Sequence, residues 1–361
     1  MAKFEGVEWA PHQFQYLIQT KKHQLLDANS KTFAISRSLH YGLFLVFEGI
    51  RFFIAKKGTE LELHFVNLDH NLNRFRKGIL YSISPADRDF VPTENELRAM
   101  FLDGFFRKPE LRPFLQKMAD HQSQGYFRPF TLDEIQSIGV TFPQEPGIRA
   151  AMCSYTGYLG EPFDGVVVPN LVRAVSTNGT GCLKLGSNYL LSVKAVQQAH
   201  EVVSTAHAAL FLDDRPDLPL EERKITEWDS SCALFALKNG SIIKIPEGPL
   251  ILPSVTIQGV CALARERGIR VIERNILYGE LMDWVEKKQL VAVCSIGTAG
   301  ILNRCSSLYL VNEKLEVMLR HEAQSEHPLY QKLSEIRSDY WNIYTGEKSV
   351  PVGLIVEKHV L

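Results

Sequence analysis

The sequence is organised around one lysine between glycines, in the stretch Asn178-Gly179-Thr180-Gly181-Cys182-Leu183-Lys184-Leu185-Gly186-Ser187-Asn188-Tyr189. The glycines permit tight turns and let a flat ligand come close to the backbone. Lys184 has apolar neighbours and no acidic residue within five positions on either side. A lysine in such surroundings can lose its proton and attack a carbonyl carbon. The apolar spacing that follows predicts a helix over residues 189–208.

The composition is that of an ordinary globular protein. The chain has 361 residues, enough for two domains, with 45% hydrophobic and 22% charged residues. Its formal net charge of -1 gives no bulk attraction to nucleic acid or to an anionic membrane. No apolar run reaches the roughly 18 residues of a membrane span, and the charged start does not resemble a signal peptide. We therefore expect a cytoplasmic protein with neither nucleic acid nor a membrane as a partner.

Several common chemistries have no motif in this chain. The six cysteines are not spaced as in a zinc ribbon or a CxxC redox pair, and we expect reduced thiols. The eleven histidines form no HExxH motif and no paired metal-ligand spacing, so no metal site is predicted. The glycines near Lys184 do not form a P-loop, and no GxSxG motif occurs.

The pattern of strands and helices predicts an α+β or mixed α/β protein in two domains. In the first half we expect strands at 41–54, 60–66, 126–130 and 148–155, a helix at 69–81 with Asp69 as a possible N-cap, and a broken helix at 93–120. In the second half, Asn239-Gly240 predicts a hairpin, and a helix at 255–267 follows it. The turn residues 160–165 suggest a boundary, which gives a small domain at 1–158, a linker at 159–169 and a large domain at 170–361.

A resemblance to a known family strengthens the interpretation of Lys184. The run Lys-Leu-Gly-Ser-Asn-Tyr at 184–189, followed by Leu-Leu-Ser, resembles the cofactor-lysine segment of the branched-chain aminotransferases. These are fold-type IV enzymes that use pyridoxal 5'-phosphate (PLP), and other family motifs occur in the family's order from about Leu39 to Gly346. The resemblance implies the two-domain fold-type IV architecture, with PLP in the cleft between the domains, and a homodimer.

The resemblance also implies a set of cofactor-binding residues. Lys184 would form the Schiff base and move the proton during catalysis, and Tyr189 would hold the phenolic oxygen of PLP. Glu227, in Ile225-Thr226-Glu227, would pair with the pyridine nitrogen. This segment departs from the family, because the loop after Glu227 is one residue longer and Ala233 stands where asparagine is usual. The implied phosphate contacts are Arg74, Val255, Thr256 and Thr298.

The implied substrate-binding residues are mostly aromatic. Tyr126-Phe127-Arg128-Pro129 resembles a family strand in which Tyr126 would touch the substrate carboxylate and Arg128 the distal carboxylate of glutamate. The N–H groups of Thr298 and Ala299 would also face the substrate carboxylate. Four residues separate Gly42 from Phe47 where three are usual, so the pocket can be reshaped. The further pocket candidates are Tyr41, Phe47, Tyr155 and Tyr158.

The sequence therefore predicts a PLP-dependent aminotransferase that moves the amino group of an apolar, branched-chain type L-amino acid to 2-oxoglutarate. Two alternatives remain open at this stage. One is another fold-type IV activity, a D-amino-acid aminotransferase or an aminodeoxychorismate lyase. The other is a PLP-binding paralogue with little turnover, because the sequence departs from the family pattern at 43–46, 228–233 and Asn303-Arg304.

Overall fold

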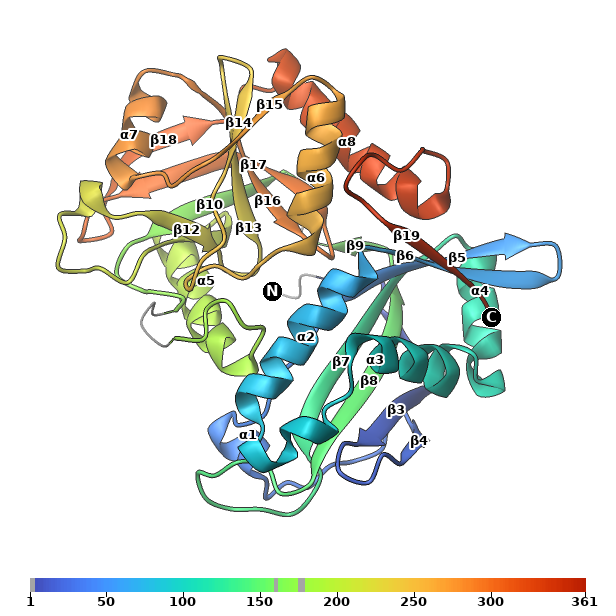
Figure 1. The fold of residues 1–361 in the computed structure, drawn as a ribbon. Helices are drawn as coiled ribbons and strands as arrows, with labels where there is room; N and C mark the ends of the chain where they lie inside the picture. Colours follow the sequence, from blue (N-terminus) through green and yellow to red (C-terminus); the bar gives the residue numbers. More distant parts are fainter. Residues whose placement is uncertain (1–3, 159–161, 175–178) are drawn as a thin grey trace.

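The computed structural model describes residues 4–158, 162–174 and 179–361. The chain forms two large sheets, one built mainly from its first half and one from its second, with helices packed on each (Figure 1). A short additional pairing joins β1 (Phe4–Glu5) to β9 (Gly157–Tyr158), just before the chain passes from the first sheet to the second.

In the described residues, eight strands form an antiparallel sheet in the order β19-β6-β5-β7-β8-β3-β4, with β2 paired to β8. Because the C-terminal strand β19 pairs with β6, the end of the chain returns to the sheet of the first half (Figure 1). The strands are β2 (Glu8–Trp9), β3 (His12–Leu17), β4 (His23–Asp27), β5 (Ile50–Lys57), β6 (Glu60–Val66), β7 (Gln124–Asp133), β8 (Pro146–Tyr155) and β19 (Val356–Val360).

Helices cover one side of this sheet and enclose its core. The core contains the buried side chains Leu72, Phe75 and Ile79 of α2, which lie three or four positions apart and so form one face of the helix. Thr93 caps α3 in a capping box with Glu96, which fixes where that helix begins. The helices are α1 (Arg37–Tyr41), α2 (Leu68–Ser82), α3 (Glu94–Phe101) and α4 (Arg112–Asp120).

The second sheet, of nine strands within the described ranges, closes on itself. Its order is β12-β11-β10-β17-β16-β13-β14-β15 with β18 on β17, and β12 also pairs with β13, so that six strands form a ring. The strands are β10 (Phe163–Val168), β11 (Ala206–Leu212), β12 (Ile225–Trp228), β13 (Cys232–Leu237), β14 (Ser241–Lys244), β15 (Arg270–Glu273), β16 (Leu290–Gly297), β17 (Ile301–Val311) and β18 (Val317–Glu322).

Apolar cores lie on both sides of this second sheet. One is filled from α6 and α8, and another contains buried side chains of α7 together with Trp228 and Phe235. Ser254 caps α6 by accepting a hydrogen bond from the N–H of Ile257, which sets the position of the helix N-terminus. The helices are α5 (Leu190–Val202), α6 (Val255–Glu266), α7 (Tyr278–Glu286) and α8 (Pro328–Thr345).

Several expected elements differ in the structure. The predicted strand at 41–54 is wrong in its first part, because α1 ends at Tyr41, and Gly42 and Phe44 adopt left-handed conformations with φ of 67° and 55°. The predicted helix at 189–208 ends at Val202, and its last residues belong to β11. Asp69 is not the N-cap of α2, since Asn67 occupies that position.

The predicted linker at 159–169 also differs. Residues 159–161 lie outside the described residues, and Phe163–Val168 form β10 inside the ring of the second sheet. The domain boundaries themselves stay a prediction. All six cysteines are free thiols. Among the described residues, no helix combines the length and the apolar character needed to cross a bilayer.

Candidate active site

Lys184 lies in a loop that is held in place from two sides. The buried Asn188 amide donates to the carbonyls of Thr180 and Leu183, at 2.8 and 3.1 Å, and so fixes the turn before the lysine. On the other side, the Lys184 carbonyl accepts a hydrogen bond from the N–H of Phe47 at 3.0 Å. The loop of the second sheet is therefore attached to the segment that precedes β5 in the first.

The Lys184 amine lies beside an aromatic hydroxyl. Its Nζ is 3.0 Å from the hydroxyl oxygen of Tyr189 and 4.9 Å from the centre of the Phe47 ring. Burial by itself raises the pKa of Tyr189, but the nearby charges of Lys184 and Arg173 outweigh it, and the pKa is lowered. Tyr189 can therefore interact with an anionic oxygen or an amine at this point.

Glu227 is a carboxylate buried in the wall of the same region. It lies on β12, is 2% exposed, accepts a hydrogen bond from the N–H of Leu252 at 3.3 Å, and forms an ion pair with Arg173 Nη1 at 2.6 Å. Burial raises the pKa of Glu227 to about 7, while Arg173 and the Leu252 N–H act in the opposite direction. A carboxylate held in this way can stabilise a further positively charged group that binds beside it.

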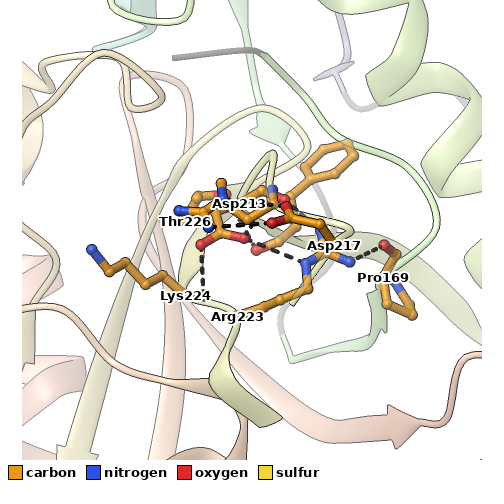
Figure 2. A network of polar contacts seen from close by, with 8 residues as sticks. Pro169, Asp213, Asp217, Arg223, Lys224 and Thr226 are labelled. Carbon is orange, nitrogen blue, oxygen red and sulfur yellow. Dashed lines mark hydrogen bonds and ion pairs between the residues drawn. The ribbon is translucent and has the colours of Figure 1, made fainter. Parts of the chain in front are cut away.

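A buried polar network fixes the start of the strand that carries Glu227 (Figure 2). Arg223 donates to the Pro169 carbonyl at 2.6 Å and forms an ion pair with Asp213 at 3.3 Å. The second Asp213 oxygen accepts the N–H of Lys224 at 3.0 Å, and Thr226 donates to the Phe211 carbonyl at 3.2 Å. The ends of β10 and β11 thus hold the first residues of β12 and set the position of Glu227.

Arg74 and the N-terminus of α6 lie together at another part of the site. The Arg74 guanidinium forms two bonds with the buried Glu48 carboxylate, Nε to Oε2 at 2.7 Å and Nη2 to Oε1 at 2.5 Å, and also donates to the Pro253 carbonyl. Burial raises the pKa of Glu48, but the pairing with Arg74 prevails and lowers it. Arg74 is thereby held beside the free N–H groups that open α6, a favourable position for an anion.

The turn between β16 and β17 is held by the first sheet. Arg51 on β5 donates from Nε to the Thr298 carbonyl at 3.0 Å and from Nη2 to the Ala299 carbonyl at 2.6 Å. The Tyr155 hydroxyl donates to the same Ala299 carbonyl at 3.1 Å. Ile301 adopts a left-handed conformation with φ of 61°, which is strained for a β-branched side chain.

These groups enclose two adjoining chambers. The inner chamber, of about 40 Å³, is lined by Arg74, Arg173, Glu227, Val255 and Thr298 together with Lys184 and Tyr189. The outer chamber, of about 120 Å³, is lined by Phe47, Tyr126, Arg128, Tyr158 and Ala299, again with Lys184 and Tyr189. Lys184 and Tyr189 thus lie at the boundary between a chamber with an anion seat and a more aromatic chamber.

Three predicted site residues lie outside both chambers. Tyr41 ends α1 with 47% of its surface exposed, Tyr155 is buried behind the turn that it supports, and Thr256 is buried near the start of α6. Arg128 does line the outer chamber, where its Nη2 donates to the Tyr126 hydroxyl at 2.5 Å and its guanidinium lies 4.5 Å from the Phe47 ring centre.

The sequence interpretation missed several residues of the site. Arg173 and Phe4 come from segments without a recognisable motif, and Ser231 and Asn303 lie where the sequence departs from the family pattern. Arg51 stands two residues after Phe47-Glu48-Gly49, and its role depends on a contact with a turn 247 positions away. Only the buried position of an arginine within an apolar strand could have drawn attention to it.

The chain was compared with family models, with curated proteins and with solved structures. No family model matches the chain. A curated relative, the "Probable branched-chain-amino-acid aminotransferase" of Staphylococcus aureus (strain MRSA252), is 27% identical over 315 residues, which are 86% of this chain and 78% of the relative. The chain resembles the branched-chain aminotransferases.

Solved structures with these names share the fold. The Escherichia coli branched-chain amino acid aminotransferase superposes with a TM-score of 0.68 at 21% identity, covering 95% of this chain and 98% of that one. The branched-chain amino acid aminotransferase from Thermobaculum terrenum, in its PLP form, gives 0.65 at 18% identity and covers 94% of this chain and 96% of that one. The expected fold-type IV architecture and the resemblance to the branched-chain aminotransferases are therefore confirmed.

The departures from the branched-chain aminotransferase pattern now have positions in space. In the longer loop after Glu227, the Asp229 carboxylate accepts the N–H of Ala209 at 3.3 Å on β11, whereas Ser230 and Ser231 line both chambers. Ala233 is buried on β13. The extra residue before Phe47 is accommodated near Phe44, whose φ is positive.

The residues of the inner chamber fit PLP. A dianionic phosphate needs a guanidinium and free N–H groups, and Arg74 and the start of α6 supply them. A protonated ring nitrogen needs a buried carboxylate, and Glu227 is one. The phenolic oxygen of PLP needs a hydroxyl or cationic partner, and the hydroxyl of Tyr189 lies 3.0 Å from the Lys184 amine.

Proposed function

We propose that the protein is a PLP-dependent aminotransferase that moves the amino group of a branched-chain L-amino acid to 2-oxoglutarate. The observation that carries the proposal is the position of Lys184, 3.0 Å from Tyr189 and on the boundary between the two chambers. The inner chamber offers Glu227 and Arg74, and the outer chamber offers aromatic side chains and Arg128. The relatives with this name support the choice of reaction.

The residues of the inner chamber divide the work of holding the cofactor. When bound, PLP supplies an electron sink for the charge that develops at the substrate Cα. Arg74, the N-terminal N–H groups of α6 at Val255 and Thr256, and Thr298 would hold the phosphate. Glu227 would keep the pyridine nitrogen protonated, and Tyr189 would bind the phenolic oxygen. Lys184 would be linked to the cofactor and, after the substrate displaces it, move the proton from Cα to C4′.

The outer chamber would hold the amino acid. The N–H groups of Thr298 and Ala299 would bind the α-carboxylate, assisted by Tyr126, while Arg51 and Tyr155 hold their turn from behind. Phe47 and Tyr158 would pack against an apolar side chain. The Arg128 guanidinium donates a hydrogen bond to the Tyr126 hydroxyl and forms no ion pair in the described residues, so it would receive the distal carboxylate of glutamate or 2-oxoglutarate.

We further propose a cytoplasmic homodimer. An apolar groove of about 590 Å³ runs along residues 42–45, 81–82 and 140–143, beside the Lys184 loop at Leu185. Val140 and Phe142 in it are 73% and 51% exposed, which is unusual for a surface that faces water alone. A second copy would cover it. Light scattering should give twice the chain mass, and Val140→Asp with Phe142→Asp should shift it toward one chain mass.

The function is tested with the PLP-loaded protein. We expect a visible absorption band that decreases on adding leucine and returns on adding 2-oxoglutarate, with glutamate as the product. D-leucine and a Lys184→Ala variant serve as controls, and both should give no glutamate. Turnover of D-leucine instead would favour a D-amino-acid aminotransferase, and release of pyruvate from aminodeoxychorismate would favour the lyase. A visible band without turnover of any of these would favour the low-turnover paralogue.

A further inference from the structure

Asn303 is a buried amide in the wall of the outer chamber. It lies on β17 directly opposite Ser295 of β16, and only 1% of its surface is exposed. Its side chain packs against the Cα of Gly300, where any Cβ would collide with the amide nitrogen. Gly300 thus makes room for Asn303 in the strained turn that carries Thr298 and Ala299.

Neither polar atom of this amide has a hydrogen-bond partner in the part of the chain that the structure describes. An asparagine side chain can donate two hydrogen bonds and accept two, and buried amides are nearly always paired in folded proteins. The neighbouring hydroxyls do not fill this need, because Ser231 and Ser295 bond to each other at 2.6 Å. The outer chamber therefore has an unused donor and an unused acceptor at the same point.

The charge around Asn303 favours a neutral ligand group. Arg304, the next residue, lies over the Tyr330 ring at 4.6 Å from its centre and does not line the outer chamber. Apart from Lys184, which is assigned to the cofactor, the outer chamber has the cation Arg128, which comes from β7 in the other sheet and lies against Phe47 and Tyr126. A carboxylate would be drawn to Arg128, whereas a group with both an N–H and a carbonyl oxygen matches the amide of Asn303.

We propose that Asn303 is a specificity-determining residue, and that the outer chamber accepts amino acids or 2-oxo acids whose side chain ends in a carboxamide. The inference rests on the proposed function, because it assigns the outer chamber to the substrate side chain. It extends the substrate class from branched-chain to polar side chains of the same shape. A carboxamide would pair both buried polar atoms of Asn303, which an apolar side chain leaves unpaired.

Two nearly isosteric acids allow binding of a branched-chain end to be compared with binding of a carboxamide end. In 4-methylvaleric acid the chain ends in an isopropyl group, and in succinamic acid it ends in a carboxamide of the same shape. Binding of each to the PLP-loaded protein is measured by calorimetry, which needs no turnover. We expect Asn303→Leu to weaken binding of succinamate at least about tenfold, while binding of 4-methylvalerate changes much less.

Controls keep the result interpretable. Ser306→Ala changes the same strand outside the chamber, where the Ser306 hydroxyl bonds to Asp164, and should leave both affinities unchanged. If Asn303→Leu fails to fold or to bind PLP, Asn303→Ala carries the same expectation. If Asn303→Leu changes the affinity for both acids by the same factor, or for neither acid, the proposed role of Asn303 is overturned. If the wild-type protein binds 4-methylvalerate but not succinamate, only this inference fails; if it binds neither acid, the proposed function fails with it.

Discussion

Arg173 and Glu227 form a buried ion pair, with Nη1 of the arginine 2.6 Å from Oε1 of the glutamate and both side chains 3% exposed. Burial alone would favour the protonated acid, and it raises the pKa of Glu227 to about 7. Arg173 opposes this shift and so favours the ionised form of Glu227 near neutral pH. Arg173, together with the Leu252 N–H, therefore stabilises the negative charge of the buried Glu227 carboxylate in the inner chamber.

Glu227→Gln should retain PLP but lose activity. A carboxylate beside the ring nitrogen helps mainly when charge develops at Cα, so its loss should lower kcat more than it changes cofactor affinity. Removal of one well-placed electrostatic stabiliser costs roughly 10²–10³ in rate. Steady-state kinetics with leucine and 2-oxoglutarate, together with the cofactor content of the purified variant, measure both quantities.

Asp229→Asn is the matched control for this prediction. Asp229 lies two residues further along, but its carboxylate accepts an N–H from β11 and it lines neither chamber. The asparagine variant should therefore show nearly wild-type kcat. If Asp229→Asn abolished turnover and Glu227→Gln did not, the assignment of the ring-nitrogen partner would be wrong.

Arg74→Ala should weaken PLP binding more than it slows the PLP-saturated enzyme. A phosphate contact is held equally in the ground state and the transition state, so it contributes to cofactor affinity and not to the barrier. The dissociation constant for PLP, from fluorescence titration of the apoprotein, should rise, while kcat at saturating PLP changes little.

The same substitution also leaves Glu48 without its partner. Breaking a buried ion pair by removing one side costs about 3–5 kcal/mol, because the remaining charge stays buried. The double variant Arg74→Ala with Glu48→Gln removes that charge and should recover part of the stability in urea unfolding, without restoring PLP affinity. Unchanged PLP affinity together with a lower saturated rate would contradict the phosphate role of Arg74.

Much of the second sheet could be predicted from local sequence. The Asn239-Gly240 turn lies between β13 and β14, and α6 ends one residue before Arg267, close to the predicted boundary. Local patterns did not give the limits of α5, because apolar spacing continues past Val202 although the chain has already turned toward β11. They also did not give the pairing of β19 with β6, which joins segments nearly 300 residues apart.

The site is predictable where a motif carries its residues. Lys184, Tyr189, Glu227 and Arg74 follow from sequence motifs, and the structure places them around one chamber. Arg173 does not, because its partner Glu227 is 54 positions away and nothing beside it in the sequence indicates burial. Tyr41 is predicted as a pocket residue, yet it ends a helix on the surface of the single chain.

Lys184 should carry the cofactor covalently. Borohydride treatment of the PLP-loaded protein should abolish the visible band and leave a stable adduct, and peptide mapping should find the adduct on Lys184. Lys194, on the helix that follows, is a useful internal control because it lies outside both chambers and should remain unmodified. An adduct on Lys194, or the absence of any adduct, would contradict the assignment.

His321 should make stability depend on pH. It lies on β18 opposite Leu308, is 5% exposed, and burial lowers its pKa from 6.5 to about 4, although the Val291 backbone acts in the opposite direction. Because the folded pKa lies below the unfolded one, the stability contributed by neutral His321 is complete above about pH 6.5 and is lost as the pH falls toward 4. The full loss corresponds to about 3 kcal/mol.

In urea unfolding at fixed protein concentration, wild type should therefore lose more stability than His321→Gln between pH 7 and pH 4.5, since the other titrating groups are common to both. Parallel stability curves would show that His321 takes up its proton over the same pH range in the folded protein as in the unfolded chain, and would contradict the lowered pKa.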